Sequence, residues 1–374
     1  MKYLLTLLLS SLLINSLNCS FQEEIFTKMN KDKKGNNVII SPLSIFQALS
    51  LLANGAKEET LSQMLEMLES NTIDELNDIN YKIISSFKEF TTMEIANAVM
   101  TRFTPLEDFS NIAEEYLAPV EPLESLEQVN NWCNNKTHGK IEKILDSLDP
   151  STLMIILNAV YFKGEWFNKF KEDLTKNLTF YNLGKEEILV ETMSQFGIFK
   201  YYEDKKVQAI ELGFVKDFMT AVIILPSEET DINKYIDTLF TSNEEFAQIT
   251  KGLKNSNVHL QLPKFELACN YTLGGVLGSL GMINAFNPDL ADLTGLRKEG
   301  NLFVNEVIHK TYLRVFEDGC EAAAVTAIDI MGGGGLVDDK IYEMKINRPF
   351  LFFLKNYKMP AGYELIFMSK IEKL

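Results

Sequence analysis

The strongest constraint on the fold comes from a strand-like segment near the C-terminus that runs directly into a glycine run. Between residues 317 and 331 small or apolar side chains recur at every second position, so an extended chain would have one apolar and one mixed face. The first half of the segment uses only small side chains on its apolar face, so it fits between two existing strands without steric clashes. Residues 332–335 are all glycine, which is typical of a flexible, solvated loop. The pattern indicates either an edge strand that ends in a flexible turn, or a segment that is a loop in one state and a strand in another.

Composition and charge indicate an acidic globular protein. Its 374 residues are 46% hydrophobic and 24% charged, an ordinary globular composition with enough apolar side chains for a large core. The formal net charge of -16 repels phosphate backbones, so we expect no nucleic-acid partner. The same charge argues against a strong heparin site, since residues 31–34 form only a small basic cluster.

The first residues, 1–19, have the pattern of a secretory signal peptide. Lys2 supplies a positive start, and residues 4–14 form an apolar stretch that is too short to span a bilayer. Small and polar residues follow, so we expect cleavage near residues 18–20 and a secreted, extracellular protein without membrane attachment. An uncleaved anchor is the alternative. No later stretch reaches ~18 uninterrupted apolar residues, so no other segment is expected to cross a membrane.

Cysteine and histidine spacing predicts no metal and no cofactor. The four cysteines are spread too widely for a disulfide framework or a metal motif, and Cys133 and Cys269 fit buried small thiols better. The three histidines form no ligand-spaced cluster. Three Asn-x-Thr triplets are candidate glycosylation acceptors, at Asn135, Asn177 and Asn270.

A search for catalytic motifs gives no candidate, so we predict that the protein is not an enzyme and has no catalytic residues. Residues 278–281 lack the spacing of a hydrolase nucleophile turn. The glycines at 332–335 are not followed by the lysine and hydroxyl residue of a phosphate-binding loop.

Three stretches of the sequence carry a resemblance to a known family. They read Asn-Val-Ile-Ile-Ser-Pro-Leu-Ser-Ile at 37–45, Asn-Ala-Val-Tyr-Phe-Lys-Gly-Glu-Trp at 158–166, and Glu-Asp-Gly-Cys-Glu-Ala-Ala-Ala-Val-Thr-Ala at 317–327. Each closely resembles a signature of the serpins, a family of suicide protease inhibitors, and further matches run from Phe21 to the C-terminus. The resemblance implies an α+β fold with three β-sheets, about eight or nine helices and an exposed reactive-centre loop. It also implies one domain over residues 20–374 with the loop at about 317–343, although length alone favours two domains.

The resemblance assigns roles to particular residues. The hinge of the reactive loop would comprise Glu317, Gly319, Cys320, Glu321, Ala322, Ala323, Ala324 and Thr326. The gate in the central sheet, called the shutter and the breach in this family, would comprise Ser41, Ser44, Asn158, Trp166 and His309. We expect His309 to hydrogen-bond Asn158 at the centre of the sheet.

Two positions depart from the family pattern. Position 320, usually threonine, is Cys320, which is small enough to insert into a sheet but can be oxidised. The family often pairs the hinge glutamate with a lysine on a neighbouring strand. Asn284 stands at the matching position, so we do not expect Glu317 to form that ion pair.

The bond that a protease would cut lies in a loop that is longer than the family's usual one. Counting forward from the hinge glycine gives Gly333, whereas counting back from Pro349 gives Asp338. The candidates in this region are Met331, Gly332, Gly333, Gly334, Gly335 and Leu336. Met331 and Leu336 are the better anchors and suit a chymotrypsin-like or elastase-like enzyme, while Lys340 would suit a trypsin-like one but sits late.

The function implied by the resemblance is a secreted, monomeric suicide inhibitor that traps a serine protease in a covalent complex. Two alternatives stay open: a non-inhibitory carrier or chaperone on the same fold, and an inhibitor of a cysteine protease. Non-inhibitory members usually have bulky, charged or proline residues in the hinge, and this hinge has none beyond the family pattern.

Overall fold

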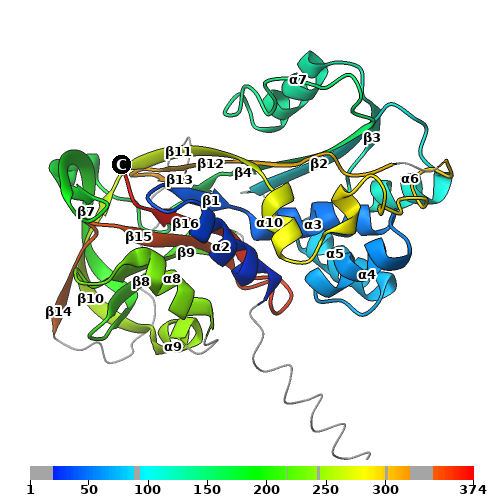
Figure 1. Ribbon diagram of the computed structural model, residues 1–374. Helices are drawn as coiled ribbons and strands as arrows, with labels where there is room; N and C mark the ends of the chain where they lie inside the picture. Colours follow the sequence, from blue (N-terminus) through cyan, green and yellow to red (C-terminus); the bar gives the residue numbers. More distant parts are fainter. Residues whose placement is uncertain (1–19, 88–92, 217, 242–244, 300–301, 321–339) are drawn as a thin grey trace, which may run out of the picture.

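The computed structural model describes residues 20–87, 93–216, 218–241, 245–299, 302–320 and 340–374 (Figure 1). In these ranges the chain forms nine α-helices and three β-sheets, so the predicted α+β architecture is confirmed. The helices are α2 (Phe21–Asp32), α3 (Pro42–Ala53), α4 (Glu58–Met67), α5 (Ile73–Phe87), α6 (Glu107–Glu115), α7 (Leu126–Lys136), α8 (Ile232–Thr241), α9 (Glu245–Gly252) and α10 (Gly274–Ser279). Two 3-10 turns are η1 (Glu172–Leu174) and η2 (Asn284–Phe286). None of the described helices is long and apolar enough to cross a membrane.

The central sheet has five strands in the order β11-β12-β4-β2-β3. Its members are β2 (Met93–Thr101), β3 (Val120–Pro122), β4 (Met154–Phe162), β11 (Phe265–Thr272) and β12 (Val307–Val315). The pairs β11–β12 and β4–β2 are antiparallel, and β3 pairs in parallel with β2 over only three residues at the edge of the sheet. The longer parallel pair is formed by β12 and β4 inside the sheet. This parallel pair is where a further strand can be accommodated with an antiparallel partner on each side.

A larger, nine-stranded sheet packs below the central sheet in Figure 1 and has the order β1-β16-β15-β9-β8-β7-β10-β14, with β6 paired to β7. Its strands are β1 (Val38–Ile40), β6 (Lys176–Asn182), β7 (Glu186–Glu203), β8 (Val207–Gly213), β9 (Met219–Pro226), β10 (Lys254–Pro263), β14 (Ile341–Lys345), β15 (Phe350–Asn356) and β16 (Leu365–Ile371). The third sheet is the short pair β5 (Gly164–Glu165) and β13 (Gly319–Cys320).

Helix α3 ties the two large sheets together. All twelve of its residues are buried, and it packs against β4 of the central sheet and β16 of the nine-stranded one. Ser41 caps its N-terminus by accepting a hydrogen bond from the Ser44 backbone, and Pro42 occupies the first helical position, where its missing N–H costs nothing. The helix therefore begins at a fixed point directly beside the central sheet.

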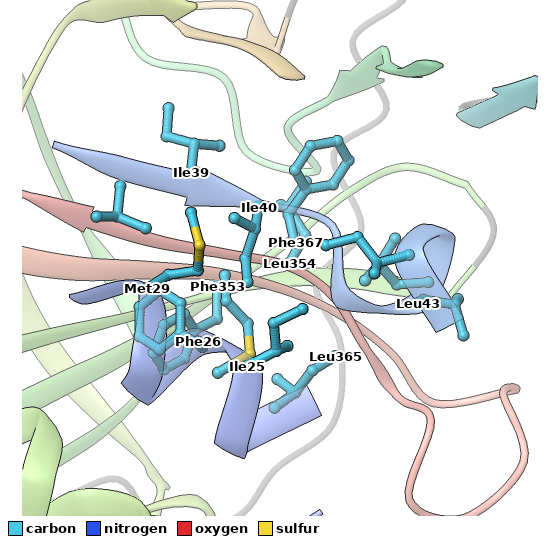
Figure 2. Packing of buried hydrophobic residues seen from close by; sticks show 14 of the residues in the cluster. Ile25, Phe26, Met29, Ile39, Ile40, Leu43, Phe353, Leu354, Leu365 and Phe367 are labelled. Carbon is cyan, nitrogen blue, oxygen red and sulfur yellow. The ribbon is translucent and has the colours of Figure 1, made fainter. Parts of the chain in front are cut away.

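Aromatic side chains fill the core between α2 and the nine-stranded sheet. The Phe26 ring lies 5.6 Å from the Phe353 ring and 6.1 Å from the Phe240 ring, in edge-to-face geometry. Figure 2 shows Ile25, Phe26 and Met29 of α2 directed at β15. The spacing of these residues along α2 is the helical one that the sequence predicts.

The proline in β10 lies where the strand has only one neighbour. A proline within a strand pattern normally indicates an edge or a bulge. Although β10 lies between β7 and β14, its pairing with β14 ends at Gln261. Pro263 is the last residue of β10, opposite Thr192 of β7. The missing proline N–H is tolerated there because the ladder ends at that residue.

Candidate functional site

The candidate site is the line along which β4 and β12 meet. Both strands are nine residues long, but they are paired only between Ile156–Val160 and Val307–Thr311. Beyond Thr311 the chain continues through four more residues of β12 and then reverses in a tight turn, where Phe316 and Gly319 exchange two backbone hydrogen bonds of 2.9 and 3.1 Å. In the described part of the sheet, β4 and β12 are therefore not paired with each other at the end where the chain leaves the sheet.

A buried hydrogen-bond network joins β4 and β12 where the two strands are paired. His309 is 1% exposed, and its Nε2 accepts the Ser41 N–H at 3.0 Å. Nδ1 must then carry the proton, which it donates to Asn158 Oδ1 at 3.0 Å. The hydrogen bond expected between these two side chains is present, and it bridges β12 and β4.

Asn158 extends this network to two further elements. Its Nδ2 donates to the Ser44 carbonyl of α3 at 3.2 Å and to Asn97 Oδ1 of β2 at 2.7 Å. Four of the predicted gate residues, Ser41, Ser44, Asn158 and His309, thus lie together at one point. Sequence reasoning missed Asn97, whose only signal is a polar residue inside the apolar run 95–100 of β2.

Burial keeps the His309 ring neutral. The ring has no carboxylate against it, and desolvation lowers its pKa to about 3. Neutral imidazole suits this position because one ring nitrogen has to accept a hydrogen bond while the other donates one. Protonation would place an unpaired charge between the strands.

The fifth predicted gate residue, Trp166, lies at the end where β4 and β12 are not paired. It is 1% exposed and stacks on Phe214 with ring centroids 4.5 Å apart. Its indole N–H donates to the Phe316 carbonyl at 3.0 Å, and its backbone N–H donates to the Asp318 carbonyl at 2.9 Å. Trp166 therefore holds the turn that follows β12.

The hinge glutamate is paired, which corrects the expectation drawn from Asn284. Glu317 is 7% exposed, with Lys264 Nζ at 3.2 Å and the Thr175 hydroxyl donating to it at 2.7 Å. Asn284 instead lies in η2, where its backbone N–H donates to Gln63. Burial opposes ionisation of Glu317, but the hydrogen bonds from Thr175, from its own backbone and from Lys264 outweigh it and hold the pKa of the carboxyl below its ordinary value.

Gly319 is required by close backbone approach. Its φ is +153°, and a Cβ at this position would lie 2.0 Å from the Gly164 carbonyl oxygen. The next residue, Cys320, is 1% exposed and pairs with Gly164, and burial raises the pKa of its thiol. The hinge is thus packed against β5 at its start, with no room for a side chain at 319.

Several predicted residues lie outside the described part of the chain. These are the signal peptide at 1–19, the hinge residues Glu321, Ala322, Ala323, Ala324 and Thr326, and the region of the cut bond from Met331 through Leu336. The three candidate glycosylation acceptors, Asn135, Asn177 and Asn270, are described and exposed. Among the described residues no group of His, Cys, Asp and Glu has the arrangement of a metal site.

Comparison with known proteins identifies the family. The family model described as serpin (serine protease inhibitor) matches residues 16–373. Leukocyte elastase inhibitor of Xenopus laevis is 31% identical over 367 residues, which cover 92% of this chain and 95% of that protein. Antithrombin-III of Homo sapiens is 29% identical over 383 residues, covering 96% of this chain and 81% of that protein.

Solved structures agree with the sequence comparisons. The native state of the thermophilic serpin tengpin is 33% identical and superposes with a TM-score of 0.83, covering 95% of this chain and 92% of tengpin. Thyroxine-binding globulin, solved with thyroxine, has the same fold with a TM-score of 0.83 at 23% identity, covering 96% of this chain and 99% of the globulin.

The His309 network predicts a specific loss of stability in acid. An unfolded histidine titrates near its ordinary pKa of 6.5, whereas His309 in the folded chain titrates at about 3, so between these values the unfolded state binds more protons. The free energy of unfolding should therefore fall by ~1.4 kcal/mol per pH unit from this group as the pH drops below 6.5. His309→Gln should be less stable at pH 7, and its deficit should shrink as the pH is lowered to 4.5, measured by midpoints of urea unfolding. Parallel curves for His309→Gln and wild type would contradict the assignment.

The Lys264–Glu317 pair predicts that the hinge is restrained by charge. Lys264→Met removes the cation and leaves a largely buried carboxylate with the Thr175 hydroxyl, which should cost ~1–3 kcal/mol and lower the thermal midpoint. Lys31→Met removes the exposed pair with Asp237 at 3.4 Å and should change stability by less than ~1 kcal/mol. Equal midpoints for Lys264→Met and Lys31→Met, measured by circular dichroism, would show that the pair does not restrain the hinge.

Proposed function

The chain belongs to the serpin family of serine protease inhibitors, and on this basis we propose that it inhibits a serine protease as a suicide substrate. The observation that carries the proposal is the parallel pair β4 and β12, whose strands are not paired at the end beside the start of the hinge. A strand that follows the turn at residues 316–319 and runs back between them would be antiparallel to both neighbours.

The proposed mechanism begins with the protease cutting the segment between β13 and β14. The hydroxyl of the protease serine attacks a loop carbonyl and the peptide C–N bond breaks. The new amino terminus stays on the β14 side, and the acyl group, now an ester of the protease, stays on the hinge side. Cleavage releases the hinge from β14, so the hinge is free to move with the protease attached.

The driving force is the formation of new strand ladders. Insertion of about 15 residues at ~3.3 Å each carries the protease ~50 Å. If about ten additional ladder hydrogen bonds each contribute ~1 kcal/mol net, the gain is on the order of 10 kcal/mol. That energy is available to distort the protease before water hydrolyses the ester.

The hydrogen bonds around His309 would oppose insertion of the hinge between β4 and β12. The inserted strand has to separate His309 from Asn158, because their hydrogen bond crosses the line between the strands. The Trp166 bonds to the turn and the Lys264 pair with Glu317 would hold the hinge outside the sheet until cleavage. Slow insertion before cleavage and fast insertion afterwards is the behaviour that an inhibitor of this kind needs.

The target we propose is a chymotrypsin-like or elastase-like protease. Met331 and Leu336 are the side chains near the expected cut that such enzymes accept. The 31% identity with a protein named leukocyte elastase inhibitor supports this target class. We also propose that the inhibitor acts as a monomer.

The parity of the hinge gives a direct test of insertion. On an inserted strand, Ala324 shares the small-residue face with Ala322, whereas Ala323 falls on the opposite face. Ala324→Arg should be cleaved without trapping, because a charged side chain would enter the packed side of the sheet. Ala323→Arg, the matched control, should still trap the protease in an SDS-stable complex on a gel. A stable complex with Ala324→Arg would contradict the insertion mechanism, and clean cleavage of the wild type would favour a non-inhibitory member.

We propose further that the protein is secreted after removal of residues 1–19. Ser20 caps α2, with the Ser20 N–H donating to Glu23 Oε2 at 3.0 Å, so cleavage just before it leaves the folded domain intact. In secretory cells the medium should contain a chain that begins at residues 19–21, measured by intact mass. Leu8→Arg, which interrupts the apolar stretch, should be retained, and Leu8→Ile should be secreted. Wild type that stays inside the cells with residues 1–19 attached would overturn secretion.

A further inference from the structure

Three large apolar side chains stand together on the open face of β7, β10 and β14. In the register of these strands Ile198, Asn257 and Ile341 form one row, and Phe196, His259 and Glu343 form the next. Directly paired residues share a face, neighbouring strands are ~4.8 Å apart and residues two apart on one strand are ~7 Å apart, so Phe196, Ile198 and Ile341 lie within ~12 Å of one another. Their exposed fractions are 59%, 55% and 59%.

A groove extends this surface toward the breach. It has a volume of about 360 Å³, and its lining includes Trp166, Phe167, Ile198 and Asn255. Phe167 is 50% exposed. We call the surface formed by Phe167, Phe196, Ile198 and Ile341 the apolar face.

The apolar face departs from the usual pattern of a sheet with one side in water. The opposite side of these strands is packed, since Val258, Leu260 and Met344 are fully buried, and the solvent side should then be polar. Polar residues do occupy the rest of it, including Ser194 bonded to His259 and Glu343 paired with Lys345. Large apolar side chains grouped on such a surface mark a place where another molecule binds.

Both ends of the reactive loop reach the apolar face. Ile341 belongs to the face and is the first residue of β14, near the C-terminal end of the segment 317–343 that the resemblance assigns to the loop. At the other end, Cys320 pairs with Gly164, and Trp166 and Phe167 follow within three residues to line the groove. Figure 1 shows β7, β10 and β14 at one end of the molecule, opposite α4, α5 and α6. Both attachment points of the loop therefore lie beside the apolar face.

We propose that the apolar face is a second contact surface for the target protease, which binds the body of that enzyme while the loop occupies its active site. This inference rests on the proposed inhibitory function and adds a determinant of which protease is recognised. Contact with a second copy of the chain is disfavoured, because each copy carries a net charge of -16 and β14 at the edge of the sheet carries Glu343 and Lys345.

The test is the rate of complex formation with an elastase-like and a chymotrypsin-like protease. The double variant Phe196→Ser, Ile198→Ser, with both changes on β7 and outside the loop, should form the covalent complex at least about tenfold more slowly, since buried apolar anchors dominate such contacts. The number of inhibitor molecules consumed per protease should stay that of the wild type, because loop chemistry and insertion are unchanged. Leu290→Ser is the control: Leu290 is 54% exposed and lies in the segment that bonds to Gly55 and Thr60, at the other end of the molecule.

Each outcome decides the proposal. Equal rates for the double variant and wild type overturn the second contact surface and leave the inhibitory function standing. If wild type forms no complex with any protease, both proposals fail. If wild type sediments as a dimer and the double variant as a monomer, the face joins two copies and the protease assignment is wrong. Should the double variant not fold, Phe196→Ser alone should still slow the reaction about threefold, and an unchanged rate overturns the proposal.

Discussion

The structure depends on one buried contact, the His309 ring held between Ser41 and Asn158. Its two hydrogen bonds of 3.0 Å connect β12, β4 and the start of α3, so the same ring joins the two halves of the central sheet and links them to the helix beneath. The contact uses no charge, and burial lowers the pKa of the ring so that it stays neutral. A neutral bridge is strong enough to hold the strands and can be parted without exposing an ion to the core.

The opposite end of the same strands is held by different means. There the restraint includes hydrogen bonds from Trp166 to the turn and ion pairs of Lys264 with Glu317 and of Lys169 with Asp318. Neutral hydrogen bonds thus connect the strands at one end, and charged contacts hold the turn at the other. The proposed insertion would require these contacts to break in order, from the end nearest the hinge.

The resemblance carried by short motifs with fixed spacing predicted the architecture, and it named Ser41, Ser44, Asn158 and His309, which the structure brings together. It did not predict the partner of Glu317, since Lys264 lies far away in the chain and reaches the hinge only through the junction between β10 and β11. Asn97 was missed for a similar reason: its amide acts through Asn158 on the neighbouring strand. Local pattern identifies the elements, whereas long-range pairing decides which polar groups meet.

The crowded backbone at Gly319 has a consequence for how this protein can change. The turn before the loop is fixed because nothing larger than hydrogen fits at that position, and the far end is fixed by the parallel pairing of β14 with β10. Residues added or lost between Gly319 and β14 change the length of the intervening segment without moving either attachment point. The length and sequence of that segment can therefore change while the two attachment points keep their positions in the fold.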